Sequence, residues 1–300
     1  MRRFRAALLP LAVAAAVVST SERPAAWGFE AHRFVADRAI DLLPAEIRPY
    51  FVKHRAFIAE HAIDPDLWRT AGFAEEPPQH FLDMDAFGPA PFDALPRDKD
   101  QAIAKFGKEM IQKNGLLPWR VEEMHGRLVR AFGDVKARRP YGRDNVKFLS
   151  AVVAHYVSDA HVPFHAVLNY DGQLTNQHGL HSRFESALFE RYRARLQIRP
   201  VPTRLTTTPR DFVFDTLITS ASLVDPILVA DREAIGTGEV YDRAYFDRFF
   251  AKTRPTLERR LSEAIAAAAA VITHAWEEAG KPSMADVPAA ERRRRPAVPQ

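Results

Sequence analysis

The sequence predicts a single all-α domain over residues 27–280, and three observations support this fold class. Apolar residues recur at intervals of three and four through most of that range, which is the period of an amphipathic helix. No segment shows the strict alternation of a half-buried strand, and no segment is repeated. The chain has 300 residues, of which 47% are hydrophobic, and this is enough to bury a substantial core.

The first 26 residues have the pattern of a secretory signal peptide. Three arginines precede the apolar run 7–18, and Pro24-Ala25-Ala26 supplies small residues before Trp27. The run is too short to span a bilayer comfortably, and a buried N-terminal helix is the alternative interpretation. We therefore expect cleavage before Trp27, a secreted or periplasmic mature chain, and no transmembrane span within it.

The body of the chain is slightly acidic. Of the net charge of +4, residues 1–26 and 291–300 contribute +3 each, which leaves −2 for residues 27–290. This balance excludes a broad basic surface for nucleic acid, so an anionic substrate needs a local site. Residues 281–300 are rich in Pro, Ala and Arg, the composition of a disordered tail. Because the chain has no cysteine, its core or bound metal must stabilise an exported fold.

Helical patterns follow one another along the mature chain. Pro44 stops the first helix, and Pro118 suits the first turn of a later one. We expect helices over about 27–43, 45–61, 98–113, 118–138, 145–161, 179–197, 209–230 and 241–279. Pro65 is expected to break regular structure around Asp66, and His80 lies in a proline-punctuated loop. Functional residues favour such loops when a rigid scaffold holds them.

Two pairs of potential metal ligands are spaced four residues apart. His155 and Asp159 form one pair, and His181 and Glu185 form the other, so each pair projects from one face of its helix. A single pair of this kind is usually a solvated helix face, but two pairs with His165 between them favour a metal site. Imidazole and carboxylate are the ligands that suit zinc in a chain without cysteine. A cation would also offset the cost of burying Asp159 in an apolar helix.

These residues belong to a longer ordered pattern that resembles a known family. The pattern is Trp-x4-His (Trp27, His32), Asp66 after a proline, His-Phe-x-Asp from His80, His-x3-Asp-x5-His (His155, Asp159, His165) and His-x3-Glu (His181, Glu185). It resembles the three-zinc phosphodiesterase superfamily, which contains bacterial zinc-dependent phospholipases C and fungal single-strand-specific zinc nucleases. Each motif alone is weak, whereas the ordered set is highly specific and covers more than half of the mature chain.

The resemblance implies three Zn²⁺ ions per chain in one compact site of an all-helical domain. The first ion would be held by Asp66, His80, His155 and Asp159. The second would be held by His32, by Asp159 as a bridge, and by the α-amino nitrogen and carbonyl oxygen of Trp27. The third would be held by His165, His181 and Glu185. The implied activity is phosphodiester hydrolysis by metal-activated water, with Asp66 and Arg69 as catalytic residues and no obligate protein partner.

The resemblance also implies contacts with the substrate. Arg69 matches a position that contacts phosphate in the nucleases, and its planar fork suits that role. A surface salt bridge to Asp66 or Glu60 is the alternative for Arg69. Phe81 and Asp83 match residues that bind a base in the nucleases, but phospholipases carry the same His-Phe-x-Asp motif. These two residues therefore do not distinguish a single-stranded nucleic acid from a phospholipid head group.

Several features bear on the choice between these substrates. The short Trp-x4-His spacing, Arg69 and His161 favour a nuclease. Two features weigh against one: Glu185 stands where the nucleases use Asp, as in the phospholipases, and a chain without cysteine cannot form the disulfides typical of fungal nucleases. A non-catalytic zinc-stabilised binding protein is the third interpretation. His161 is a candidate to orient a metal ligand, and His178 is a candidate spare ligand. The remaining histidines are assigned structural or surface roles: His54, His61, His125 and His274.

The implied role of the Trp27 amine leads to a first testable prediction. Only cleavage after Ala26 frees this amine to bind metal. We expect a protein that retains even one residue before Trp27 to lose most of its activity, measured against the correctly cleaved chain with equal zinc loading. Full activity of the extended protein would contradict the assignment.

Overall fold

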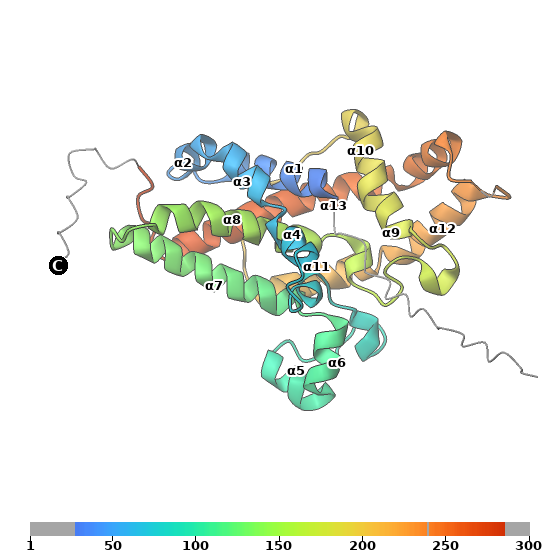
Figure 1. Ribbon diagram of the computed structural model, residues 1–300, viewed down its shortest axis with the longest axis horizontal. Helices are drawn as coiled ribbons and strands as arrows, with labels where there is room; N and C mark the ends of the chain where they lie inside the picture. Colours follow the sequence, from blue (N-terminus) through green and yellow to red (C-terminus); the bar gives the residue numbers. More distant parts are fainter. Residues whose placement is uncertain (1–27, 239, 286–300) are drawn as a thin grey trace, which may run out of the picture.

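The computed structural model describes residues 28–238 and 240–285. The described chain is built from helices, and its one extended pairing is an isolated bridge between Leu82 and Gly115 (Figure 1). The expectation of an all-α fold is therefore confirmed. The expected signal peptide, Trp27 and residues 286–300 of the expected tail lie outside the described residues.

The long helices α7, α8 and α13 run along the long axis of the molecule, and α5 and α6 project from one side (Figure 1). The α-helices are α1 (Phe29–Ala39), α2 (Arg48–Lys53), α3 (Arg55–His61), α4 (Asp64–Thr70), α5 (Lys99–Phe106), α6 (Lys108–Asn114), α7 (Leu117–Lys136), α8 (Gly142–Asp159), α9 (Leu180–Ser182), α10 (Leu188–Tyr192), α11 (Pro209–Ala221), α12 (Val224–Ile235) and α13 (Arg243–Glu278). Short 3-10 helices connect several of them, including Pro77–His80 and Pro163–His165.

Helix α8 is the centre of the bundle. It packs against α7, α13, α3 and α1, and every residue from Ser150 to Asp159 is buried. An amphipathic helix buries one face and leaves the other in water. The C-terminal half of α8 differs, because neighbouring helices cover all of its sides. The last turns of α8 therefore carry His155 and Asp159 into the interior of the protein.

Several helix boundaries differ from the predicted ones. The helix expected over 98–113 divides into α5 and α6 at Gly107, whose φ of 84° lies in the left-handed region that glycine tolerates. The segment expected over 209–230 divides after Ala221 and continues to Ile235. Pro65 does not break regular structure but occupies the first turn of α4, where no backbone N–H is needed. That expectation was wrong for this reason.

The helix expected over 179–197 is irregular. It consists of α9, a π-helical turn at Arg183–Ala187, α10 and a 3-10 turn at Arg193–Arg195. A π turn adds a residue to the helical repeat and so rotates the side chains that follow it. This irregular segment carries two of the predicted ligands.

One stretch of the described chain, 209–235, is long and apolar enough to cross a membrane by length and composition. It is formed by α11 and α12, and 44% of its most apolar 18-residue window is buried in the fold. Val213, Phe214 and Leu217 of α11 belong to the hydrophobic core, and α11 packs against α7. Core packing accounts for the apolar character of these residues.

Candidate metal centre

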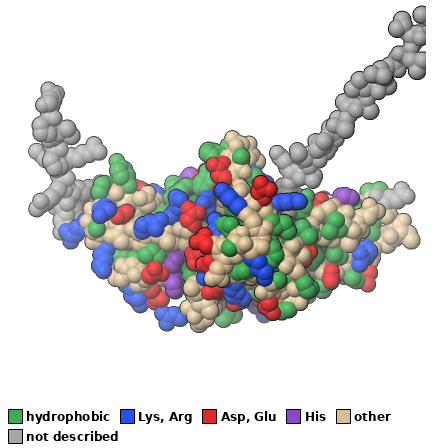
Figure 2. Space-filling view, turned by 90° about the horizontal axis from the view of Figure 1, so that it is seen from below, with side chains coloured by type: hydrophobic (Ala, Val, Ile, Leu, Met, Phe, Trp, Pro, Cys, Tyr) green, Lys and Arg blue, Asp and Glu red, His purple; other side chains and the backbone are tan. Residues whose placement is uncertain are grey.

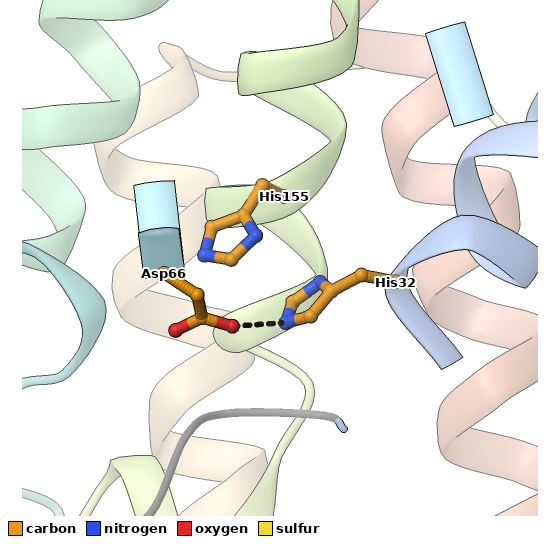
Figure 3. A group of neighbouring side chains, drawn as sticks. All are labelled: His32, Asp66 and His155. Atoms are coloured by element: carbon orange, nitrogen blue, oxygen red, sulfur yellow. Dashed lines mark ion pairs between the residues drawn. The ribbon is translucent and has the colours of Figure 1, made fainter. Parts of the chain in front are cut away.

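Three side chains from separate helices converge beside the last turns of α8. His32 of α1, Asp66 of α4 and His155 of α8 point toward one another (Figure 3). Nε2 of His32 lies 4.0 Å from Oδ2 of Asp66, and the His32 and His155 rings stack with their centroids 3.9 Å apart. All three residues are buried. Because each residue comes from a different helix, the packing of α1, α4 and α8 creates the group.

A second group shares His155 with the first. Nδ1 of His80 lies 3.0 Å from Oδ2 of Asp159 and 3.0 Å from Nε2 of His155. The other carboxylate oxygen of Asp159 lies 3.4 Å from Nε2 of His32. Asp159 therefore contacts histidines from both groups, which form one continuous cluster.

A third group is formed by His165, His181 and Glu185, whose potential ligand atoms all lie within 4.8 Å of one another. His165 ends the 3-10 helix that follows α8, His181 lies in α9, and Glu185 lies in the π-helical turn. Nε2 of His181 lies 3.0 Å from Oε2 of Glu185. Because π turns often occur at functional sites, this local irregularity agrees with a role in binding.

Hydrogen bonds orient the histidine rings of the cluster. In each of three rings, Nδ1 is held by an oxygen of the fold, which leaves Nε2 for the interior. The pairs are His155 with the Ala62 carbonyl at 2.8 Å, His165 with the His80 carbonyl at 2.6 Å, and His32 with the Ser158 hydroxyl at 2.8 Å. Ser158 donates its own proton to the His155 carbonyl, so its oxygen accepts from His32. This arrangement fixes the tautomer that metal-ligating histidines need.

The ring of His80 is oriented by a carboxylate. Its Nε2 lies 3.5 Å from Oε1 of Glu76, which in turn accepts a hydrogen bond from the Tyr156 hydroxyl. Arg120 donates to the same hydroxyl at 3.1 Å and lies 3.5 Å from Glu76. Burial disfavours a charge on His80, but hydrogen bonds to Asp159 and Glu76 outweigh it and raise its pKa to about 9. Sequence reasoning missed Glu76, although its four-residue spacing from His80 could have indicated it.

Buried polar atoms without partners show what the cluster can bind. Among the described residues, both carboxylate oxygens of Asp66 and Glu185, Oδ1 of Asp159 and Nε2 of His32 are buried without a hydrogen-bond partner. Such atoms cost about 1–3 kcal/mol each, and more when charged. Burial raises the pKa of Asp66, and it raises the pKa of Glu185 well above its ordinary value. Cations would supply the missing partners, so these His, Asp and Glu groups can hold metal ions.

The predicted substrate-binding residues lie beside this cluster or beneath the surface. Nη2 of Arg69 lies 3.8 Å from Oδ1 of Asp66, and the Arg69 side chain is 18% exposed. Arg69 is thus partly exposed to solvent and also contacts the cluster through Asp66. Asp66 is one of the two acidic residues that the sequence offered as ion-pair partners of Arg69. Phe81 is 8% exposed and Asp83 is fully buried. The backbone N–H of Asp83 donates to the carbonyl of Asn114 at 2.8 Å, which ties this loop to α6.

The two additional histidines lie elsewhere. Nδ1 of His161 donates to the Val157 carbonyl at 2.8 Å, and the His161 carbonyl accepts from Arg260 at 3.0 Å. His161 lines a pocket of about 560 Å³ together with residues of α11 and α13. His178 is exposed. Neither residue belongs to a group of potential metal ligands in the described chain.

Fold and site together define a class: an all-helical protein with a buried His/Asp/Glu cluster that can hold metal ions. No model of a known protein family matches this chain, and no curated protein matches it. Function is therefore inferred from the residues of the site.

Proposed function

We propose that this protein is a secreted or periplasmic zinc-dependent phosphodiester hydrolase of the three-zinc superfamily, with single-stranded nucleic acid as substrate. The observation that carries the proposal is the convergence of three fully buried carboxylates, Asp66, Asp159 and Glu185, with histidines oriented by hydrogen bonds. A purely structural ion-pair cluster would satisfy its own carboxylates, whereas five carboxylate oxygens here lack hydrogen-bond partners among the described residues.

The described residues that would hold zinc are His32, Asp66, His80, His155, Asp159, His165, His181 and Glu185. Zinc bound there would lower the pKa of water and neutralise charge on phosphoryl oxygens. The donor set of imidazole and carboxylate without thiolate suits zinc, and His and carboxylate ligands are typical of catalytic rather than structural zinc sites. The three groups adjoin within one cluster, as a multi-metal phosphoesterase requires.

Residues of the chain supply proton transfer and substrate binding. Asp66 has two carboxylate oxygens without hydrogen-bond partners among the described residues, so one could hold zinc while the other accepts the proton of the attacking water. Arg69, partly exposed beside Asp66, is suited to bind non-bridging oxygens of the phosphate through its planar guanidinium. Asp66 and Arg69 are three residues apart and lie on one face of α4. A phosphate bound by Arg69 would therefore lie next to the proton acceptor.

The charge of the surface does not distinguish the substrates. On the face shown in Figure 2, Lys/Arg and Asp/Glu side chains are interspersed, which agrees with the net charge of −2 expected for the body of the chain. The Trp-x4-His spacing and Arg69 support a nuclease. Glu185 supports the alternative of a phospholipase C, and a non-catalytic zinc-stabilised protein is the third candidate.

One experiment separates these functions. The chain beginning at Trp27 is loaded with zinc, and its hydrolysis of single-stranded DNA and RNA is compared with that of phosphatidylcholine, each with a chelator control. We expect chelator-sensitive cleavage of the nucleic acids to be faster. Faster cleavage of the lipid would assign the site to a phospholipase, and binding of zinc without turnover of either substrate would refute catalysis.

A further inference from the structure

A separate cluster of potential ligands lies between α7 and α13. It contains His125 of α7 with His274 and Glu278 of α13, and none of these residues belongs to the three groups of the buried centre. Nε2 of His125 lies 2.9 Å from Nδ1 of His274. Oε2 of Glu278 lies 3.9 Å from the first nitrogen and 3.8 Å from the second. We propose that His125, His274 and Glu278 form an additional binding site for a divalent transition-metal ion.

The two helices present these atoms from opposite sides of a shared interface. α7 and α13 pack against each other, and His274 and Glu278 are one turn apart on the same face of α13. This four-residue spacing of His and Glu is the one found in His181 and Glu185. An ion held here would join residues 149 positions apart in the chain.

The contact between the two rings shows that a lone pair is present: one nitrogen donates and the other accepts, so at least one of these two nitrogens carries no proton. Burial, and next the neighbouring His274 ring, lower the pKa of His125 to about 4. In the metal-free pair, one ring donates its N–H to the other, so metal binding requires only a shift of that proton to the second nitrogen of the same ring.

The separations between the three potential ligand atoms are close to those around a bound zinc ion. Nitrogen atoms bound tetrahedrally to zinc at 2.0–2.1 Å are about 3.3 Å apart, so the His125 and His274 nitrogens need to separate by only a few tenths of an ångström. Glu278 needs to approach by a similar amount. Its side chain is 54% exposed and that of His274 is 33% exposed, so both have room to adjust.

An open pocket gives an ion access to these ligands. The pocket has a volume of about 670 Å³ and is lined by His125, His274 and Glu278 together with the threonine-rich segment 206–208 and Glu122. Glu122 is engaged by Arg210, whose Nη1 lies 3.6 Å from its Oε1, which leaves Glu278 as the carboxylate ligand. Two imidazoles and one carboxylate at a wet surface favour Zn²⁺, Ni²⁺ or Cu²⁺ over Mg²⁺ or Ca²⁺.

Metal titration tests this site without reference to hydrolysis. The full-length mature protein is purified with its resident metal, its metal content is measured, and Ni²⁺ or Zn²⁺ is titrated by calorimetry into the wild type and into His274→Gln and Glu278→Gln. We expect the wild type to bind one more equivalent than His274→Gln, and Glu278→Gln to weaken that equivalent by about tenfold or more. His54→Gln, a substitution of a histidine outside every ligand group, serves as the matched control and keeps the extra equivalent.

Spectroscopy supplies a second measurement that does not depend on stoichiometry. Cu²⁺ added to the wild type gives an electron paramagnetic resonance signal split by two nitrogens, and we expect this signal to lose one nitrogen in His274→Gln. His274 is partly exposed, so this variant folds even where His125→Gln does not. The proposal is overturned when wild type and His274→Gln take up equal metal, or when the two-nitrogen signal persists in His274→Gln.

Discussion

Asp159→Asn is expected to lower phosphodiester hydrolysis by about 10³-fold or more and to remove part of the bound metal. Asp159 contacts His80, His155 and His32 at 3.0–3.4 Å, so it touches histidines of two of the three groups at once. Burial opposes the ionisation of Asp159, but the neighbouring His155 and hydrogen bonds from His155 and His80 outweigh burial and hold the pKa of Asp159 well below the ordinary value. An amide keeps the shape of the side chain but loses the negative charge that holds cations.

The magnitude follows from the contribution of metal ions to catalysis. Stabilisation of several kcal/mol corresponds to about three powers of ten in rate. The measurements are kcat/KM on the preferred substrate and metal content per chain. Asp144→Asn is the matched control, because Asp144 lies on the same helix but is exposed and paired with Lys147 at 2.7 Å. Unchanged metal content and activity in Asp159→Asn would exclude Asp159 as a ligand.

Removal of metal is expected to lower the melting temperature by about 10 °C or more. Asp66, Asp159 and Glu185 are fully buried, and five of their six carboxylate oxygens accept no hydrogen bond within the described residues, so metal-free folding leaves their charge poorly compensated. An uncompensated buried charge costs about 3–5 kcal/mol, and about 2–4 °C is lost per kcal/mol in a domain of this size. Thermal unfolding of the protein before and after dialysis against a chelator measures the change, and restoration by added zinc is the control.

Glu185→Gln separates the cost of the buried charge from the role of metal. In the metal-free protein, burial raises the pKa of Glu185 well above its value in the unfolded chain. The stability contributed by the protonated form is present below the unfolded pKa and is lost as pH rises toward the folded pKa. Glu185→Gln should therefore melt higher than the metal-free wild type at pH 8, with a smaller difference at pH 4. With zinc present, the order reverses, because the variant lacks a ligand.

An equal melting temperature with and without metal would contradict this interpretation. A Glu185→Gln variant that is less stable than the wild type at pH 8 without metal would also contradict it.

Asp171 offers a matched acidic control near Glu185. Its carboxylate accepts hydrogen bonds from the backbone N–H groups of Gly179 and His181. Asp171→Asn weakens those bonds, so it destabilises the protein whether metal is present or not.

The fold class and the residue types of the candidate site could be predicted from the amino-acid sequence. Apolar periodicity is local, so it predicted most helices, and the four-residue spacing of His155 and Asp159 is sufficient to place both on one face of α8. Proline and glycine were less informative, since Pro65 begins a helix and Pro255 lies inside α13 without ending it. Whether a proline ends a helix depends on which backbone groups its neighbours need.

Which side chains contact one another could not be predicted from the sequence and is seen in the packing of the helices. The stacking of His32 on His155, the support of His80 by Glu76, and the approach of His125 to His274 all join separate helices. The sequence assigned His125 and His274 to structural or surface roles, and the structure places them beside Glu278. The π-helical turn at Arg183–Ala187 likewise has no local signature, yet it orients Glu185. Such contacts depend on how amphipathic faces pack, and this packing is fixed by the shapes of many side chains at once rather than by the spacing of a few residues.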